Sequence, residues 1–85
     1  MRLPVIKHMY SFIEENDSDY VSEAISFLEH LTESEAVKDE ELDVIGELLS
    51  NMYGALEVEN LVRGGMTQKD ALNAFMKRVM NSIDK

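Results

Sequence analysis

Apolar residues recur at helical spacing in four segments of this sequence, and polar residues separate the segments. The first segment starts near Pro4, which the opening turn of a helix tolerates because the missing N–H would have no partner there. The apolar positions that follow share one broad face: Val5, Ile6, Met9, Tyr10, Phe12 and Ile13. The pattern predicts an amphipathic helix followed by a turn at residues 16–18, which also supplies caps for the next helix.

The second and fourth segments repeat this pattern. Residues 19–31 have an apolar side that Tyr20 and Phe27 flank, formed by Val21, Ala24, Ile25, Leu28 and Leu31. A polar, acidic loop is expected at residues 32–38. The last helix opens with Thr67 as N-cap and Asp70 three residues later. Its apolar positions are the most regular in the chain: Ala71, Leu72, Phe75, Met76, Val79, Met80 and Ile83.

The third segment is the longest. Asp39 is expected to cap it, and it runs to about Arg63, where Gly64 and Gly65 end it because glycine adopts a positive φ at little cost. About 24 helical residues make a rod of about 36 Å. A compact chain of this length has a diameter of roughly 31 Å. A straight third helix would therefore overhang its own domain, so we expect that it kinks or that something covers its protruding end.

The apolar face of this long segment changes direction near Gly54. The upstream apolar positions share one face: Leu42, Ile45, Leu48, Leu49, Met52, Tyr53 and Leu56. Downstream, Val58 and Leu61 occupy directions that were polar before, which turns the apolar stripe by roughly a right angle. Gly46, Ser50 and Gly54 also form a ridge of small residues that another backbone can approach.

Three explanations of this ridge stay open: tight packing within one chain, a helix–helix contact across a homodimer, and a kink without a partner. For the homodimer, the predicted contact residues are Gly46, Ser50, Gly54, Val58, Leu61 and Val62. The sequence has no period-two run of β-branched residues that would indicate a strand. It predicts an all-α, four-helix bundle-like single domain over residues 1–85, with neighbouring helices antiparallel and a long third helix at about residues 39–63.

Charge is distributed unevenly along the chain. The formal net charge is −9, but residues 14–59 contain fifteen acidic residues against Lys38 as the one basic residue, while both ends are basic. The ends can relieve repulsion in the middle by folding back over it. The acidic side chains either form an ordinary solvated surface or receive a basic partner. The acidic face for such a partner consists of Glu33, Glu35, Asp39, Glu40, Glu41 and Asp43.

The composition excludes several kinds of chemistry. With no cysteine, the chain forms no disulfide, thiolate zinc site or thiol redox centre. The two histidines, His8 and His30, lack the Glu-x-x-His spacing of a di-iron bundle and are interpreted as partly exposed polar residues. No window of acidic residues has the spacing of an EF-hand calcium loop. We therefore expect no metal, no cofactor and no catalytic residues.

Other partners are also constrained by the sequence. Direct binding to nucleic acid is disfavoured because the acidic chain lacks clustered Lys and Arg. Residues 65–72 are similar to the start of the second helix in helix-turn-helix domains, but no DNA-reading helix follows them. No apolar run is long enough for a membrane span, and Met1 to Ile6 lack the features of a signal peptide. The six methionines fill gaps in a core or form an adaptable docking surface.

Several phrases of the chain resemble a small bacterial family of short, acidic, helical proteins of unknown function. They are residues 1–7, 38–48 (Lys-Asp-Glu-Glu-Leu-Asp-Val-Ile-Gly-Glu-Leu), 51–57 (Asn-Met-Tyr-Gly-Ala-Leu-Glu) and 70–76, and the resemblance extends over nearly the whole chain. The resemblance implies a cytoplasmic protein with no assigned reaction and, as a partner, a thioredoxin-fold protein. It carries over no functional residues.

Together these observations favour a cytoplasmic, non-catalytic interaction or scaffold protein that forms a homodimer through its long third helix. The alternative is an acidic decoy that binds a basic, nucleic-acid-binding protein surface through the acidic face. An enzyme would need a polar cleft that the sequence does not indicate.

Overall fold

The chain folds into four α-helices. A computed structural model describes residues 2–83, with side chains described up to residue 80. The helices are α1 (Leu3–Glu15), α2 (Ser18–Leu31), α3 (Asp39–Arg63) and α4 (Gln68–Ile83), and the described residues include no strand. The predicted all-α fold with a long third helix at residues 39–63 is confirmed.

Most helix ends follow the predicted local signals. Pro4 lies in the first turn of α1. The side chain of Asp17 accepts a hydrogen bond from the Asp19 backbone N–H at 3.1 Å, and so caps α2. Thr67 caps α4 in the same way, because its Oγ1 accepts from the Asp70 N–H at 3.1 Å. Gly65 adopts a φ of +115° after α3, where a side chain would be strained.

The predicted cap of α3 is wrong by one residue. Asp39 is the first residue of the helix, and Lys38 occupies the N-cap position. The Lys38 backbone N–H donates to Glu41 Oε1 at 3.0 Å. Asp39, Glu40 and Glu41 all lie in the first turn, where negative charge interacts favourably with the helix dipole.

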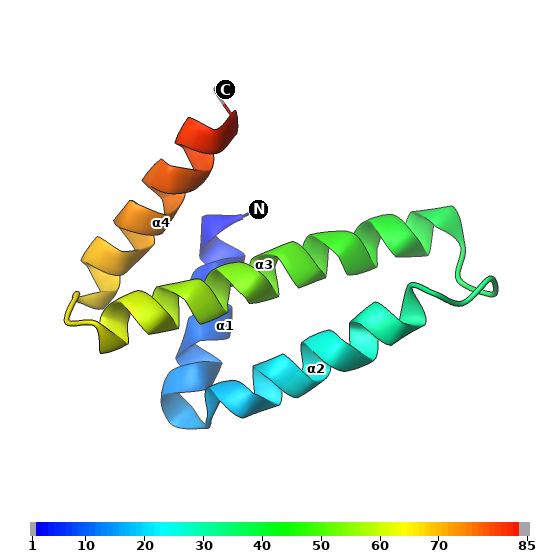
Figure 1. Cartoon of the computed structure of the whole chain (residues 1–85), viewed down its shortest axis with the longest axis horizontal. Coiled ribbons are helices and arrows are strands. Elements are labelled where there is room, and N and C mark those ends of the chain that lie inside the picture. The colour runs from blue at the N-terminus through cyan, green and yellow to red at the C-terminus, as the bar shows by residue number, and fades with distance from the viewer. Residues whose placement is uncertain (1, 84–85) are drawn as a thin grey trace.

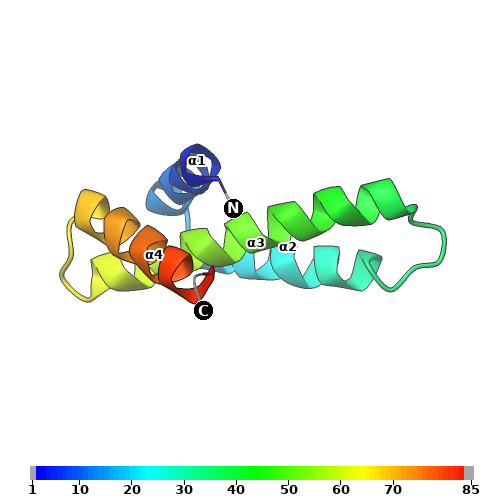
Figure 2. The same ribbon diagram turned by 90° about the horizontal axis from the view of Figure 1, so that it is seen from above.

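Helix α3 is the centre of the fold, since α1, α2 and α4 each pack against it. Figure 1 shows α2 beside the N-terminal half of α3, α4 turning back from its C-terminal end, and α1 crossing it. In Figure 2, α1 lies to one side of the other helices. The molecule is flat, with extents of 43 × 35 × 17 Å.

This shape resolves the predicted overhang. Helix α3 is continuous from Asp39 to Arg63, including Gly54, and the longest dimension of the molecule is 43 Å. The radius of gyration is 13.8 Å, above the value of about 12 Å for a compact chain of this length. The long helix is therefore accommodated by an elongated domain.

The core forms where α1, α2 and α4 meet α3. Its apolar members are Ile6, Tyr10, Ile13, Val21, Ile25, Ala55, Val58, Ala71, Leu72 and Phe75. The turn of the apolar stripe near Gly54 corresponds to a change of neighbour. Met52 lies with Val21 and Ala24 of α2, whereas Gly54 contacts α1 and α4.

The basic ends fold back onto the acidic middle, as the charge distribution predicts. Arg2 Nε lies 3.0 Å from Glu47 Oε1, and Arg78 pairs with Glu57. A third pair, Arg63 and Glu59, lies within α3 with Nε and Oε1 at 2.7 Å. The basic partner of each pair is exposed, although the Glu59 side chain is only 13% exposed. Water around the basic groups weakens these pairs, to about 0–1 kcal/mol for a typical surface pair.

Candidate interaction surface

The predicted contact residues of α3 do not form one surface. Gly46 is exposed, and a Cβ built on it would meet nothing within 4 Å. Ser50, Leu61 and Val62 are half-buried, and the two apolar ones pack against the core. Gly54 and Val58 are buried, with Val58 fully inaccessible.

Gly54 is explained by packing within the chain. A Cβ at this position would lie 2.9 Å from Phe75 Cζ and 3.1 Å from Ile6 Cδ1. The absence of a side chain therefore lets α1 and α4 approach α3 closely. Because Gly54 and Val58 lie inside the fold, they are not available to a second copy. The predicted contact set is corrected accordingly.

The predicted acidic face is brought together at one end of the molecule. All six of its residues are exposed, and they lie in the loop between α2 and α3 and in the first two turns of α3, far from α4 in Figure 1: Glu33, Glu35, Asp39, Glu40, Glu41 and Asp43. Within the described part of the chain, no group of three or more acidic residues or histidines is arranged to hold a metal ion.

A second surface, which the sequence did not indicate, lies in the corner between α1, α2 and the middle of α3. It is a hollow lined by Met9, Phe12, Tyr20, Val21, Ala24 and Met52. Phe12 is 45% exposed and Tyr20 60% exposed. Their rings meet edge to face, with centroids 6.1 Å apart and an interplanar angle of 83°, which is a favourable arrangement for two aromatic rings.

The apolar character continues along α3 toward the acidic face. Leu48 and Val44 precede Met52 by four and eight residues. They therefore lie on the same side of the helix. Val44 is 57% exposed. It lines a second hollow with Ile45, Glu40 and Glu41. We call the first hollow together with Val44, Ile45 and Leu48 the apolar groove.

Carboxylates lie at both ends of the apolar groove. At the α1–α2 corner, Asp17, Asp19 and Glu23 surround a small hollow that they share with Tyr20. At the other end, Glu40 and Glu41 belong to the hollow of Val44 and Ile45. The surface thus combines exposed aromatic and aliphatic side chains with negative charge on either side.

Sequence patterns could have suggested only part of this groove. Tyr20 and Phe27 flank the apolar side of α2 in the sequence, and both are exposed in the fold, Phe27 at 65%. Phe12 belongs to the apolar face of α1, yet it stays at the surface because that face is too broad for α3 to cover. The corner itself depends on how α1 and α2 cross α3.

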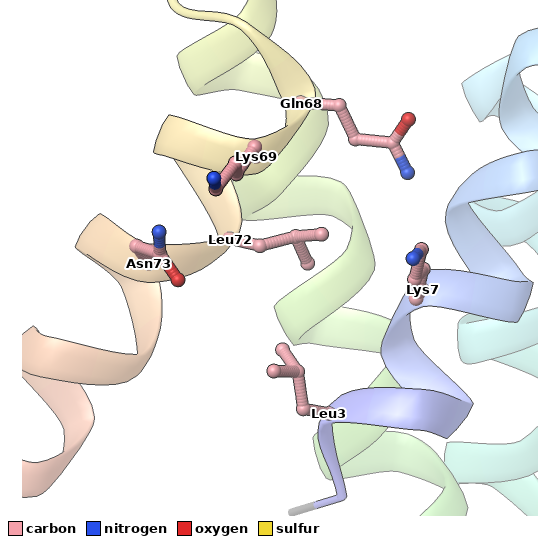
Figure 3. A pocket seen from close by; sticks show the side chains of 6 residues that line it. All are labelled: Leu3, Lys7, Gln68, Lys69, Leu72 and Asn73. Atoms are coloured by element: carbon pink, nitrogen blue, oxygen red, sulfur yellow. The ribbon is translucent and has the colours of Figure 1, made fainter.

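A different cleft lies between α1 and α4. Leu3, Lys7, Gln68, Lys69, Leu72 and Asn73 line it. Figure 3 shows Leu3 and Leu72 between the two helices, with the Gln68 side chain extending toward α1. An adjoining hollow contains His8 and Ser11, but the Ser11 hydroxyl donates its hydrogen bond to the His8 backbone carbonyl. The imidazole is therefore not the acceptor for that hydroxyl proton.

Two tyrosines have perturbed acidities. The Tyr53 hydroxyl donates to Glu29 Oε2 at 2.6 Å, and this hydrogen bond raises the pKa of Tyr53. The bond joins α3 to α2. Burial, followed by the charges of Glu14 and Glu59, raises the pKa of Tyr10. Both shifts favour the neutral phenol.

The chain belongs to a family of unknown function, DUF6952, whose model matches residues 1–84. The resemblance to an uncharacterised family is thereby confirmed. No significant match is found among curated proteins or among solved structures. None of the helices in residues 2–83 combines the length and apolar character that a membrane span requires.

Proposed function

We propose that this member of the DUF6952 family is a cytoplasmic, non-catalytic interaction protein that binds a partner protein through the apolar groove. The observation that carries the proposal is the exposure of Phe12 and Tyr20 at a hollow lined by apolar side chains. Contiguous exposed apolar surface of this kind is typical of protein contact sites, because covering it releases water from apolar area.

The methionines of the groove support an adaptable contact. Met9 and Met52 line it, and their unbranched thioether chains can repack around different apolar surfaces. Aromatic residues beside them supply rigid anchors of large area. This combination is common where one surface must accept a partner's side chains.

A homodimer through the groove is less favourable than a contact with another protein. Each copy carries a net charge of −9, and carboxylates flank both ends of the groove. Placing two such surfaces together brings like charges close to each other, which opposes association. A homodimer remains one of the outcomes that the experiment below separates.

The acidic face favours a second candidate, a decoy for a basic nucleic-acid-binding protein. Its carboxylates gather at one end of the molecule, and the ion pairs found among residues 2–80 lie elsewhere. A basic protein surface could bind there in place of a nucleic acid, with a strong dependence on salt.

The experiment is affinity capture with matched variants, followed by mass spectrometry. A groove variant carries Phe12→Ser and Tyr20→Ser, and its control carries Met66→Ser, which changes an exposed methionine at the α3–α4 turn. Circular dichroism verifies that each variant is folded. A partner that the wild type and the control retain but the groove variant loses supports the proposal. Retention of every partner by the groove variant contradicts it.

Two further measurements separate the alternatives. A decoy predicts that Glu33→Gln with Glu35→Gln releases the partner and that nucleic acid competes for it. A homodimer predicts a two-chain mass in sedimentation equilibrium that the groove variant reduces to one chain.

A further inference from the structure

We propose that the partner segment in the apolar groove is an amphipathic helix with basic residues at both ends of its apolar stripe. This inference rests on the proposed function and specifies the chemistry of the occupant. Its evidence is the polarity of the groove lining, the direction of the apolar positions on α3, and the carboxylates at the two ends.

The lining of the groove favours a helix over an extended peptide. Apart from the Tyr20 hydroxyl, the side chains of its main hollow offer no hydrogen-bonding group. An extended peptide would bury backbone N–H and C=O groups there without partners. A helix satisfies these groups internally and presents only side chains. Residues 2–83 also contain no strand to which an extended peptide could add.

The direction of the groove also fits a helix. Val44, Leu48 and Met52 lie in a row along α3, so this part of the groove runs for about 12 Å. A helix docked by its apolar face uses anchors at positions i, i+4 and i+7, which are about 10 Å apart from first to last. Beyond Met52, the corner with Phe12 and Tyr20 can receive one larger anchor.

The carboxylates at the ends specify the charge of the partner. A Lys or Arg at one end of the docked stripe would reach Glu40 and Glu41, and one at the other end would reach Asp19 and Glu23. The aliphatic stems of these basic side chains can lie on exposed apolar groups such as Val44 and Tyr20 while their charged ends meet the carboxylates. An acidic helix would meet repulsion at both ends.

A second copy of this chain does not supply such a helix. Helix α4 has apolar residues on one side and Lys69, Lys77 and Arg78 among its polar positions. However, Leu72 and Phe75 on its apolar side are buried in the chain's own core. Releasing α4 would expose that core, so the basic amphipathic helix must come from another protein.

The experiment uses three synthetic peptides labelled with fluorescein. The test peptide is an amphipathic helix with a stripe of leucines and with lysines at both ends. In the second peptide, glutamate replaces each lysine. The third peptide has the amino-acid composition of the test peptide in a scrambled order, so that its leucines form no stripe. Fluorescence anisotropy measures the binding of each peptide to the full chain. We expect the test peptide to bind about ten-fold or more tightly than either of the others.

Variants of the chain then locate the binding site. Phe12→Ser with Tyr20→Ser is expected to weaken the test peptide about ten-fold or more, whereas Met66→Ser leaves its affinity unchanged. Asp19→Asn, Glu23→Gln and Glu40→Gln together change only exposed carboxylates, and they are expected to weaken binding several-fold and to reduce its salt dependence. Circular dichroism confirms that each variant keeps its helices.

The possible results distinguish this inference from the proposed function. Equal binding of the scrambled peptide, or binding that ignores the Phe12 and Tyr20 substitutions, overturns the helix inference. If no peptide binds but a natural partner is captured through the groove, the proposed function stands and the helical partner is wrong. If neither peptide nor natural partner depends on the groove, both proposals fail.

Discussion

Asn51 shows how a single residue connects two helices of this fold. It is fully buried, and its Oδ1 accepts a hydrogen bond from the backbone N–H of Arg2 at 2.9 Å. Its Nδ2 donates to the Glu47 carbonyl oxygen at 3.0 Å. The side chain thus binds the residue that precedes α1 and positions that helix on α3. Within the described side chains, no buried polar atom lacks a partner.

Asn51→Ala is expected to destabilise the chain. The substitution leaves the Arg2 N–H without its acceptor and opens a small cavity, with an expected loss of about 1–3 kcal/mol. Asn60→Ala is the matched control, because Asn60 is exposed on the same helix and reports the gain in helix propensity alone. Urea unfolding followed by circular dichroism measures both. A stability of Asn51→Ala equal to that of the control would contradict the role of this hydrogen bond.

The two glycines inside α3 should respond oppositely to alanine. At Gly46 a methyl group meets open space, so Gly46→Ala is expected to stabilise the helix by about 0.5–1 kcal/mol. At Gly54 the methyl group would lie 2.9 Å from the Phe75 ring, and overpacking is expected to outweigh the helix gain and destabilise the fold by about 0.5–2 kcal/mol. Thermal and urea unfolding measure the pair. Equal stabilisation by both substitutions would show that the contact at Gly54 relaxes freely.

Interactions between residues close in the sequence were more predictable than interactions between residues far apart in it. The caps by Asp17 and Thr67 follow from neighbouring residues, and both are present. The Asn51 bond joins residues 49 positions apart, so no local pattern indicates it. Gly54 lies between these cases. The sequence indicates that another helix packs closely against this glycine, but it does not show whether that helix belongs to the same chain.

The helices themselves follow from hydrophobic spacing, but their neighbours do not. The spacing predicted α1 to α4 and the turn of the apolar stripe in α3. It did not show that α2 lies beside the N-terminal half of α3, that α1 crosses α3, or that α4 turns back from its C-terminal end. The groove arises from this arrangement, since Phe12 near the end of α1 and Tyr20 near the start of α2 contact each other and remain exposed.

The hydrogen bond between Tyr53 and Glu29 links α2 to α3 and predicts sensitivity to high pH. Because the folded state raises the Tyr53 pKa above 10.0, the folded chain keeps this proton longer than the unfolded chain. The stability that this hydrogen bond contributes is present below pH 10.0, and it is lost as the pH rises through the Tyr53 pKa of the folded chain.

Two variants test this link through the ultraviolet absorbance of tyrosinate. Tyr53→Phe should remove one component that titrates above 10.0, and Glu29→Gln should move that component back toward 10.0. The loss of stability at alkaline pH should also be smaller in Tyr53→Phe than in the wild type. Burial keeps the Tyr10 pKa raised in both variants. An unchanged titration in Glu29→Gln would show that the bond does not form in solution.

At the scale of the whole molecule, the flat shape and the charge have the same consequence. A domain 17 Å thick has a large surface for its volume, and it places Phe12, Tyr20 and Val44 in water together with most of its carboxylates. The uneven charge along the chain predicted that the basic ends fold onto the acidic middle, and Arg2 and Arg78 do so. The groove could not be predicted, because it depends on the angle at which helices cross.

Net charge predicts how the free chain responds to salt. The ion pairs found among residues 2–80 each have an exposed basic partner and are few, whereas fifteen acidic residues repel one another within residues 14–59. Raising the salt from about 0.01 to 0.1 M shortens the screening length from about 30 to 10 Å. We therefore expect the free energy of unfolding to rise, by on the order of 1 kcal/mol, because repulsion is screened more than the short ion pairs.

Glu33→Gln with Glu35→Gln tests whether the acidic loop causes this response. The double variant should be more stable than the wild type at low salt and should gain less from added salt, since part of the repulsion is already removed. Urea unfolding at several KCl concentrations measures both effects. A stability that falls as salt rises would instead mean that the ion pairs of Arg2 and Arg78 dominate.

The affinity of a basic helix for the apolar groove should fall over the same range of salt concentration, because salt screens the attraction between its basic residues and the carboxylates. Added salt would therefore stabilise the free chain and weaken the complex.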